Sequence, residues 1–513
     1  MTKNRFKDHN RVSSEKQNNY LISPAIPQFL FLHPAANYLL ELSHKGIILE
    51  DWLNELEEEG IEIEPGIKFT KQEITHYYGF LLFLEKNNYF EKIKTDKMTA
   101  SRYDGQSIEF ELANTIQIVF ECTSACNLKC KYCGYGDIYS ISDKRENKKL
   151  DIALGKKFFD YMAERFESPL NRRFHERIAI SFYGGEPLLN ISFIKEMVAY
   201  VKSKNYRCRK FFFTMTTNGM DIDKHMDFLV ANEFDILISL DGNKEHNGHR
   251  FKSDGSPSFE IVFENILTLK RKYPIYYEKR VRFNTVLHNK NSYKEVNDFF
   301  TTHLGKIPQI SQVNSIGIKP DKKADFDAIF KKMYSGMTPQ DLVNDIRDKQ
   351  KILRTPAAKQ IIPFLLRNSG FHFKSYNQLL NSGERFIKIS TGTCNPFERK
   401  IFLTVDGKIL PCEKILQDYY LGCVDEKGVH IDFQEIANKY NAFYKKIMHL
   451  CNRCASSDGC SMCIFMLNLL DENPACKFFK TSAETTASTS ISLSLLEETP
   501  RFYPNIMRNY QEQ

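Results

Sequence analysis

Clustered cysteines dominate the chemistry available to this 513-residue chain, which has 13 of them. The first cluster, Cys126-x3-Cys130-x2-Cys133, follows an apolar run at 115–122. Three thiolates can bind three irons of a four-iron cubane and leave the fourth iron open. Clusters that only carry electrons normally take four protein thiolates. The spacing therefore predicts an iron–sulfur cluster whose open iron takes part in chemistry.

A zinc site is the alternative for this first cluster, with Cys122 as the fourth ligand of a zinc knuckle. Cys122, however, lies inside the apolar run, where its side chain would alternate away from the loop. The spacing also lacks the two Cys-x2-Cys pairs that are typical of zinc sites. We therefore interpret Cys122 as a small buried residue.

A second motif, Tyr183-Gly184-Gly185-Glu186-Pro187, ends the next apolar run. Two glycines let backbone carbonyls approach a ligand closely, and the Glu186 carboxylate can bind a cation. On its own the motif indicates only a tight turn. Its place on the strand that follows a three-cysteine loop indicates a shared binding site.

Seven cysteines within 83 residues form a second cluster near the C-terminus. Two Cys-x2-Cys pairs among them are a poor match for a hydrophobic core and predict one or two metal centres. A single zinc site on the four cysteines of 451–463 is the alternative, but it leaves three cysteines without a role. The seven residues are Cys394, Cys412, Cys451, Cys454, Cys460, Cys463 and Cys476.

The elements that must position these cysteines alternate in type from about residue 115 to 320. Amphipathic helical stretches separate six apolar, strand-like runs, at 115–122, 177–184, 210–219, 234–242, 280–287 and 310–318. Six βα units in succession predict an α/β fold with a parallel sheet, either open or curled into a partial, TIM-like (βα)6 barrel. Ligands of such sheets bind at the carboxyl ends of the strands, where both motifs lie.

The flanking segments predict further domains around this 109–330 core. Residues 1–20 are polar and expected to be mobile, and 21–108 form a small α+β domain. A helical connection at 331–390 leads to the cysteine-rich domain at 391–480. The tail at 481–513 begins with a Ser/Thr-rich, low-complexity stretch and is predicted to be flexible.

Composition indicates an ordinary globular protein, with 42% hydrophobic and 26% charged residues. A net charge of +7 is too small to predict nucleic-acid binding, and the clearest N-terminal helical stretch, EDWLNELEEEG, is acidic. No apolar run approaches the 18 or more residues of a membrane span, and the N-terminus lacks a secretory signal core. We expect a cytoplasmic protein with no membrane and no nucleic-acid partner.

The two early motifs, CNLKCKYC and YGGEP, together resemble those of the radical S-adenosylmethionine (radical SAM) enzymes. The resemblance implies that Cys126, Cys130 and Cys133 hold a [4Fe–4S] cluster whose open iron chelates S-adenosyl-L-methionine. It also implies a 5′-deoxyadenosyl radical that abstracts a hydrogen atom, and a low-potential electron donor of the flavodoxin or ferredoxin type. The implied cofactor contacts are Tyr132, Gly184, Gly185, Glu186, Asn218, Ser239 and Arg250.

The late cysteines resemble the SPASM extension of radical enzymes that modify peptides and proteins. The resemblance implies two auxiliary clusters of the [4Fe–4S] type. Two residues, rather than the usual three, separate Cys460 from Cys463. This departure leaves two options for the inner cluster, an open iron or Cys423 as a fourth ligand. The implied ligands are Cys451, Cys454, Cys460 and Cys476 for the outer cluster, and Cys394, Cys412 and Cys463 for the inner one.

Resemblance also implies a catalytic role for Glu413, which directly follows Cys412 and matches an aspartate that acts as a base in sulfatase-maturing relatives. A solvated carboxylate on a hairpin is the alternative.

The substrate expected for such an enzyme is a peptide. An N-terminal domain at 21–108 favours a peptide maturase, since such enzymes often carry an added domain that grips the leader of a ribosomally made precursor by adding a strand or a groove contact. The segment FECTSACNLKCKYCGYGDIY resembles the maturases of Bacteroidetes-type bacteria. The product would be a crosslink, an epimerised centre or an oxidised side chain. One alternative is an anaerobic sulfatase maturase that forms formylglycine. A less favoured one is an iron–sulfur regulator that binds DNA.

Overall fold

The computed structural model describes residues 10–22, 29–90, 103–330 and 391–498, together with Phe6, Ile361, Phe364, Leu365 and Pro500. Short gaps inside these ranges fall at 137, 140–145, 174–175, 207–209, 312, 314–316, 392, 458–459, 461, 468, 470–473 and 477. The predicted helical connection at 331–390 therefore lies outside the described residues, apart from Ile361, Phe364 and Leu365. Cys208 also lies outside them.

Six parallel strands, paired in chain order, form the centre of the molecule and confirm the predicted (βα)6 α/β fold. They are β6 (Gln117–Thr123), β7 (Ile178–Gly184), β8 (Phe211–Thr217), β9 (Asp235–Ser239), β10 (Val281–Val286) and β11 (Gln309–Ser311).

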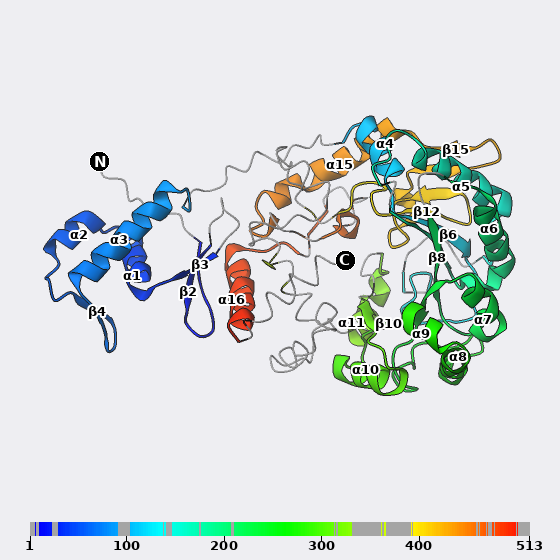
Figure 1. Ribbon diagram of the computed structural model, residues 1–513, viewed down its shortest axis with the longest axis horizontal. Coiled ribbons are helices and arrows are strands. Elements are labelled where there is room, and N and C mark those ends of the chain that lie inside the picture. The colour runs from blue at the N-terminus through cyan, green and yellow to red at the C-terminus, as the bar shows by residue number, and fades with distance from the viewer. Residues whose placement is uncertain are drawn as a thin grey trace.

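Amphipathic helices connect these strands and cover the outer side of the sheet (Figure 1). Aromatic side chains such as Phe120, Phe182 and Phe213 fill the layer between the sheet and the helices. The connecting helices are α5 (Ile152–Phe166), α6 (Ile191–Ser203), α7 (Ile222–Ala231), α8 (Phe259–Lys272), α9 (Pro274–Arg280) and α10 (Tyr293–Phe299).

The cysteine-rich domain continues the same sheet beyond β6. Strand β12 (Ile401–Leu403) pairs in parallel with β6, and β13 (Lys408–Leu410), β14 (Gly422–Val424) and β15 (Val429–His430) follow antiparallel. Helix α15 (Phe433–Cys451) then packs on α4 (Gly105–Ala113). The domain boundary predicted at residue 109 falls inside α4.

An antiparallel sheet and three helices form the N-terminal domain, which confirms the predicted α+β type. The sheet has the order β1 (Asn10–Ser13), β2 (Asn19–Ile22) and β3 (Phe29–Leu32). Residues 10–20 are therefore not the mobile segment that was predicted. The other elements are α1 (Pro34–His44), α2 (Leu49–Glu55), the β4 (Ile61–Glu64) and β5 (Ile67–Phe69) hairpin, and α3 (Lys71–Lys86).

The predicted flexible tail was wrong for residues 482–498, which form helix α16 (Ser482–Glu498). Some of its hydroxyls bond within the helix, since Ser492 and Ser494 donate to the carbonyls of Ser488 and Ser490. Buried Leu493 packs in one cluster with Val12 of β1. Helix α16 thus lies beside the N-terminal sheet, and each covers apolar surface of the other (Figure 1).

None of the described helices is long and apolar enough to cross a membrane.

Candidate active site

The cysteine loop follows β6 and pairs with the segment after β9. The Lys129 and Lys131 amides donate to the carbonyls of Phe251 and His249, at 2.8 and 3.1 Å. The pKa of the Cys130 thiol is raised to about 12, chiefly by burial; Arg250 opposes this rise, and the neighbouring Cys133 and Cys126 contribute to it. The three cysteines are therefore close enough to interact electrostatically at the carboxyl end of β6.

These three thiols are the groups that would hold a cubane. Within the described part of the chain, no three His, Cys, Asp or Glu side chains gather around one metal-ion position. The thiolate ligands of a cubane each bind a different iron and so stay apart. The amide of Leu128 already donates to Cys126 Sγ at 3.4 Å, as expected beside an anionic cluster ligand.

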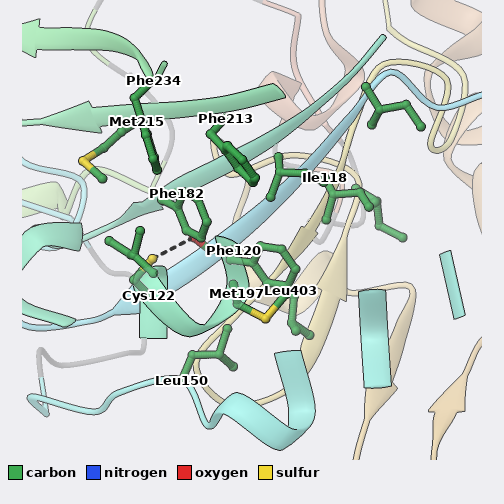
Figure 2. Close-up of a cluster of buried hydrophobic side chains, with 14 of the residues drawn as sticks. Ile118, Phe120, Cys122, Leu150, Phe182, Met197, Phe213, Met215, Phe234 and Leu403 are labelled. Carbon is green, nitrogen blue, oxygen red and sulfur yellow. Dashed lines mark hydrogen bonds between the residues drawn. The ribbon is translucent and has the colours of Figure 1, made fainter. Parts of the chain in front are cut away.

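Cys122 lies away from this loop, in the core between the sheet and the helices. Its side chain is fully buried and donates to the Phe120 carbonyl at 3.7 Å, among Phe182, Met215 and Leu150 (Figure 2). The interpretation of Cys122 as a small buried residue is confirmed.

The glycine turn after β7 lies directly against the cysteine loop. The Gly185 and Glu186 amides donate to the carbonyls of Thr123 and Ala125, both at 2.8 Å. Gly184 has a φ of 129°, and a Cβ on Gly185 would lie 2.1 Å from the Ala125 carbonyl oxygen. Only glycine lets these two backbone segments approach so closely.

Glu186 is buried behind this turn and ties it to the end of β8. Its carboxylate accepts from the Asn218 amide and the Thr217 hydroxyl, both at 2.7 Å, and from the Leu188 amide at 3.2 Å. Burial outweighs these bonds and raises the pKa of Glu186 to about 7. Asn218 in turn donates to Asn127 at 2.7 Å and reaches Cys126 Sγ at 3.7 Å. Predicted cluster and cofactor contacts at the ends of β6, β7 and β8 therefore lie side by side.

Tyr132 and Arg250 also meet, through an aspartate that the sequence interpretation did not single out. Asp241 is fully buried, accepts two bonds from Arg250 at 2.9 and 3.1 Å, and accepts another from the Tyr132 hydroxyl. Although burial opposes it, Arg250 holds the pKa of Asp241 well below its ordinary value, with help from hydrogen bonds of His288 and Tyr132. The guanidinium also lies over the Tyr132 ring, 5.1 Å from its centre.

Ser239 is the one predicted contact that stays outside these groups. It is half-buried at the end of β9, in register with Asn284 of β10. No hydrogen bond joins its side chain to the cluster of Tyr132, Asp241 and Arg250 within the described chain.

A third buried carboxylate, Glu121 of β6, lies on the side of the late cysteines. It accepts from the Tyr135 hydroxyl at 2.7 Å and from the Val405 amide at 2.9 Å. Burial raises the pKa of neighbouring Tyr183, and the charges of Glu413, Cys133 and Cys412 raise it further. Sequence reasoning missed Glu121 and Tyr135, because an acidic residue inside an apolar run was their only signal.

Glu413 is paired rather than free in solvent. Both carboxylate oxygens lie 3.0 Å from Lys400 Nζ, and the side chain is 11% exposed. Although burial opposes it, Lys400 lowers the pKa of Glu413. Glu413 is therefore held ionised beside Cys412, and not as a solvated hairpin carboxylate.

The remaining late cysteines fall in two places. Cys394 influences the pKa of Cys463 electrostatically, so these two thiols are neighbours. The Lys480 amide donates to Cys454 Sγ at 3.4 Å, and the Ala455 amide donates back to Lys480, which brings the Cys476 segment to the Cys451–Cys454 turn. Cys423 lies in β14, opposite Lys408 and His430. Within the described residues, the late thiols thus gather in two groups, one around Cys394 and Cys463 and one around Cys451, Cys454 and Cys476.

Known proteins match this chain over the same region. Residues 120–302 match the family model described as the Radical SAM superfamily. The cysteine-type anaerobic sulfatase-maturating enzyme of Clostridium novyi is 28% identical over 62% of this chain and 77% of its own length. The radical SAM cyclopropyl synthase TigE of Paramaledivibacter caminithermalis is 25% identical over 53% of this chain and 52% of its own. The solved structure of native anSMEcpe with bound AdoMet is 19% identical, covers 77% of this chain and 99% of that chain, and has a TM-score of 0.46.

Proposed function

We propose that this chain, which is a radical SAM enzyme, modifies a ribosomally made precursor peptide. When bound, the [4Fe–4S] cluster and S-adenosyl-L-methionine supply a 5′-deoxyadenosyl radical that abstracts a hydrogen atom from the substrate. Cys126, Cys130 and Cys133 would hold the cluster. A flavodoxin or ferredoxin would supply the electron.

The residues around the cysteine loop bind and orient the cofactor in this proposal. Gly184 and Gly185 would offer backbone atoms to the cofactor, and Glu186 would contribute its carboxylate charge to the binding of the methionyl ammonium while it accepts from the Asn218 amide. Tyr132 and Arg250, locked by Asp241, form a rigid wall beside Cys130. Such rigidity matters because a reactive radical needs a preorganised site that excludes water.

Two auxiliary clusters complete the proposed cofactor set. Glu413 would accept a proton from the substrate radical, whose electron would pass to the inner cluster, and the Lys400 ion pair keeps the carboxylate deprotonated until then. The proposed ligands are those implied by resemblance, Cys394, Cys412 and Cys463 for the inner cluster and Cys451, Cys454, Cys460 and Cys476 for the outer one.

The N-terminal domain is the feature that favours a precursor peptide as the substrate. Strand β3 is an edge strand, because the order of its sheet is β1-β2-β3. No other described strand pairs with its outer edge, and Phe31 on β3 is 58% exposed. An unpaired edge beside an exposed aromatic suits the addition of an extended leader peptide as a fourth strand.

A sulfatase maturase is the second candidate, because the Clostridium novyi relative is matched over 77% of its length. That enzyme class would oxidise a Cys or Ser of a sulfatase to formylglycine. The Glu413 position suits this chemistry equally well, so only the substrate separates the two candidates.

One anaerobic assay tests both candidates. The reconstituted, reduced enzyme is incubated with S-adenosyl-L-methionine and either a short peptide encoded beside its gene or a Cys-containing sulfatase peptide. We expect 5′-deoxyadenosine together with a mass change in the neighbouring peptide. A mass change confined to the sulfatase peptide would select the second candidate. Replacing Cys126, Cys130 and Cys133 with Ala is expected to abolish cofactor cleavage, and retained cleavage would refute the assignment.

A further inference from the structure

Tyr440 of α15 carries a buried hydroxyl that no neighbouring group satisfies. The side chain is fully buried, and no described residue hydrogen-bonds its hydroxyl oxygen. Buried hydroxyls are almost always paired, because an unpaired one loses its bonds to water without replacement. A fully buried hydroxyl donor without a partner indicates a hydrogen-bond acceptor that is not part of the polypeptide.

The ring of Tyr440 is fixed between the two segments that carry Cys394 and Cys463. Phe465, two residues after Cys463, meets it edge to face at 5.7 Å. Tyr103 meets it at the same distance and donates its own hydroxyl to Asn395, the residue after Cys394. Burial raises the pKa of Tyr440, and the charges of Tyr103, Tyr444, Cys463 and Cys394 contribute in the same direction.

Thr393 presents a second hydroxyl to the same place. Its oxygen accepts from the Ile464 amide at 2.8 Å and from the Thr391 hydroxyl at 2.7 Å, so its own hydrogen is available to donate. That hydrogen bonds Cys463, and the bond partly offsets the effect of burial on the Cys463 pKa. The Thr393 hydroxyl thus lies beside Cys463, and Tyr440 lies close enough to interact electrostatically with both thiols.

We infer that the Tyr440 hydroxyl donates a hydrogen bond to a sulfur atom of the inner auxiliary cluster and thereby raises the reduction potential of that cluster. The inference rests on the proposed function, which assigns Cys394 and Cys463 to that cluster. A hydrogen bond to a cluster sulfur stabilises the more negative, reduced state, and such bonds are a main means by which proteins set cluster potentials. Tyr440 is thus a tuning residue and touches no substrate.

The test is a redox titration of full-length, reconstituted Tyr440→Phe and wild-type enzyme, followed by EPR. The signal of the inner cluster is identified as the one that Cys412→Ala removes. We expect the midpoint reduction potential of this signal to be lower in Tyr440→Phe than in wild type. At fixed potential the ratio of reduced to oxidised cluster should change about tenfold, which is about 59 mV for one electron. The signals of the other clusters should keep their midpoints.

Tyr277→Phe is the matched control. Tyr277 is equally buried and donates to the Leu304 carbonyl at 2.9 Å, on the barrel side and away from the late cysteines. This control should lower the unfolding midpoint without changing any cluster potential. In cluster-free protein, Tyr440→Phe should not lower the unfolding midpoint, because the hydroxyl that it removes has no partner there.

The outcomes separate this inference from the function on which it rests. About twelve irons per chain with an unchanged midpoint in Tyr440→Phe would overturn the inference alone. About eight irons in wild type, with no signal that depends on Cys412, would overturn the inner cluster and the inference together. If Tyr440→Phe fails to fold, deuterium ENDOR of the reduced wild-type cluster in D2O tests the hydrogen bond directly. We expect a strongly coupled exchangeable deuteron at the inner cluster, and its absence would refute the hydrogen bond.

Discussion

Arg250 and Asp241 form a two-point ion pair, with hydrogen bonds of 2.9 and 3.1 Å, in a site that solvent barely reaches. The pair lies behind the cysteine loop, and the Tyr132 hydroxyl completes it. A buried charge is tolerated only while its partner remains. This pair therefore couples the shape of the loop to the segment after β9.

Replacing Asp241 with Asn leaves the Arg250 guanidinium buried without a counter-charge. We expect the apparent free energy of unfolding, measured in urea on cluster-free protein, to fall by about 3–5 kcal/mol. Asp227→Asn is the control, because Asp227 pairs with Lys272 at the surface and such pairs contribute about 0–1 kcal/mol. Equal losses in the two variants would contradict the structural role of the Asp241 pair.

Replacing Gly185 with Ala would place a Cβ 2.1 Å from the Ala125 carbonyl, a backbone atom that cannot move alone. The cysteine loop must then shift, so we expect loss of the radical cluster and of S-adenosyl-L-methionine cleavage. Gly134 lies in the same loop, but a Cβ there meets no atom within 4 Å. Gly134→Ala should keep iron content and cleavage near wild type, and a fully active Gly185→Ala would refute the close approach.

The local motifs were predictable because short spacing alone determines their chemistry. Cys126, Cys130 and Cys133 lie within eight residues of one loop after β6, so their short spacing alone keeps them close together. The parallel strand order then brings the Gly184–Glu186 turn beside them, as the rule for strand ends predicts. Fold class and the first half of the site were therefore accessible from sequence.

Other features depend on partners that are remote in sequence. The bond that ties Asp241 to the cysteine loop comes from Tyr132, 109 positions away. The sequence of α16 is rich in Ser and Thr and resembles a flexible tail. It becomes a helix that packs against β1, more than 470 residues earlier, and the Glu15 amide donates to Ser494 there. Periodicity and composition carry no information about such contacts.

Helix α16 should therefore stabilise the N-terminal sheet from outside. Leu493→Ala removes a side chain that is 1% exposed in the cluster with Val12 and Tyr20, and such cavities cost about 2–5 kcal/mol. We expect faster amide hydrogen exchange in β1 and β2. Ile491→Ala is the control on the same helix, since Ile491 is 43% exposed and should leave exchange unchanged. Unaltered exchange in Leu493→Ala would show that the contact does not support the sheet.

Phe31 tests the proposed role of the N-terminal domain in holding a precursor peptide. An aromatic anchor next to an added strand typically contributes more than its area suggests, so Phe31→Ala should weaken peptide binding about tenfold, or about 1.4 kcal/mol. Fluorescence anisotropy with a labelled precursor measures this change. Cleavage of S-adenosyl-L-methionine without peptide should stay at the wild-type rate, because Phe31 lies on β3 and not in the barrel. Ile275→Ala is the matched control, since Ile275 is 72% exposed on α9 of the barrel domain. Equal peptide affinities of Phe31→Ala and Ile275→Ala would place the peptide-binding surface elsewhere.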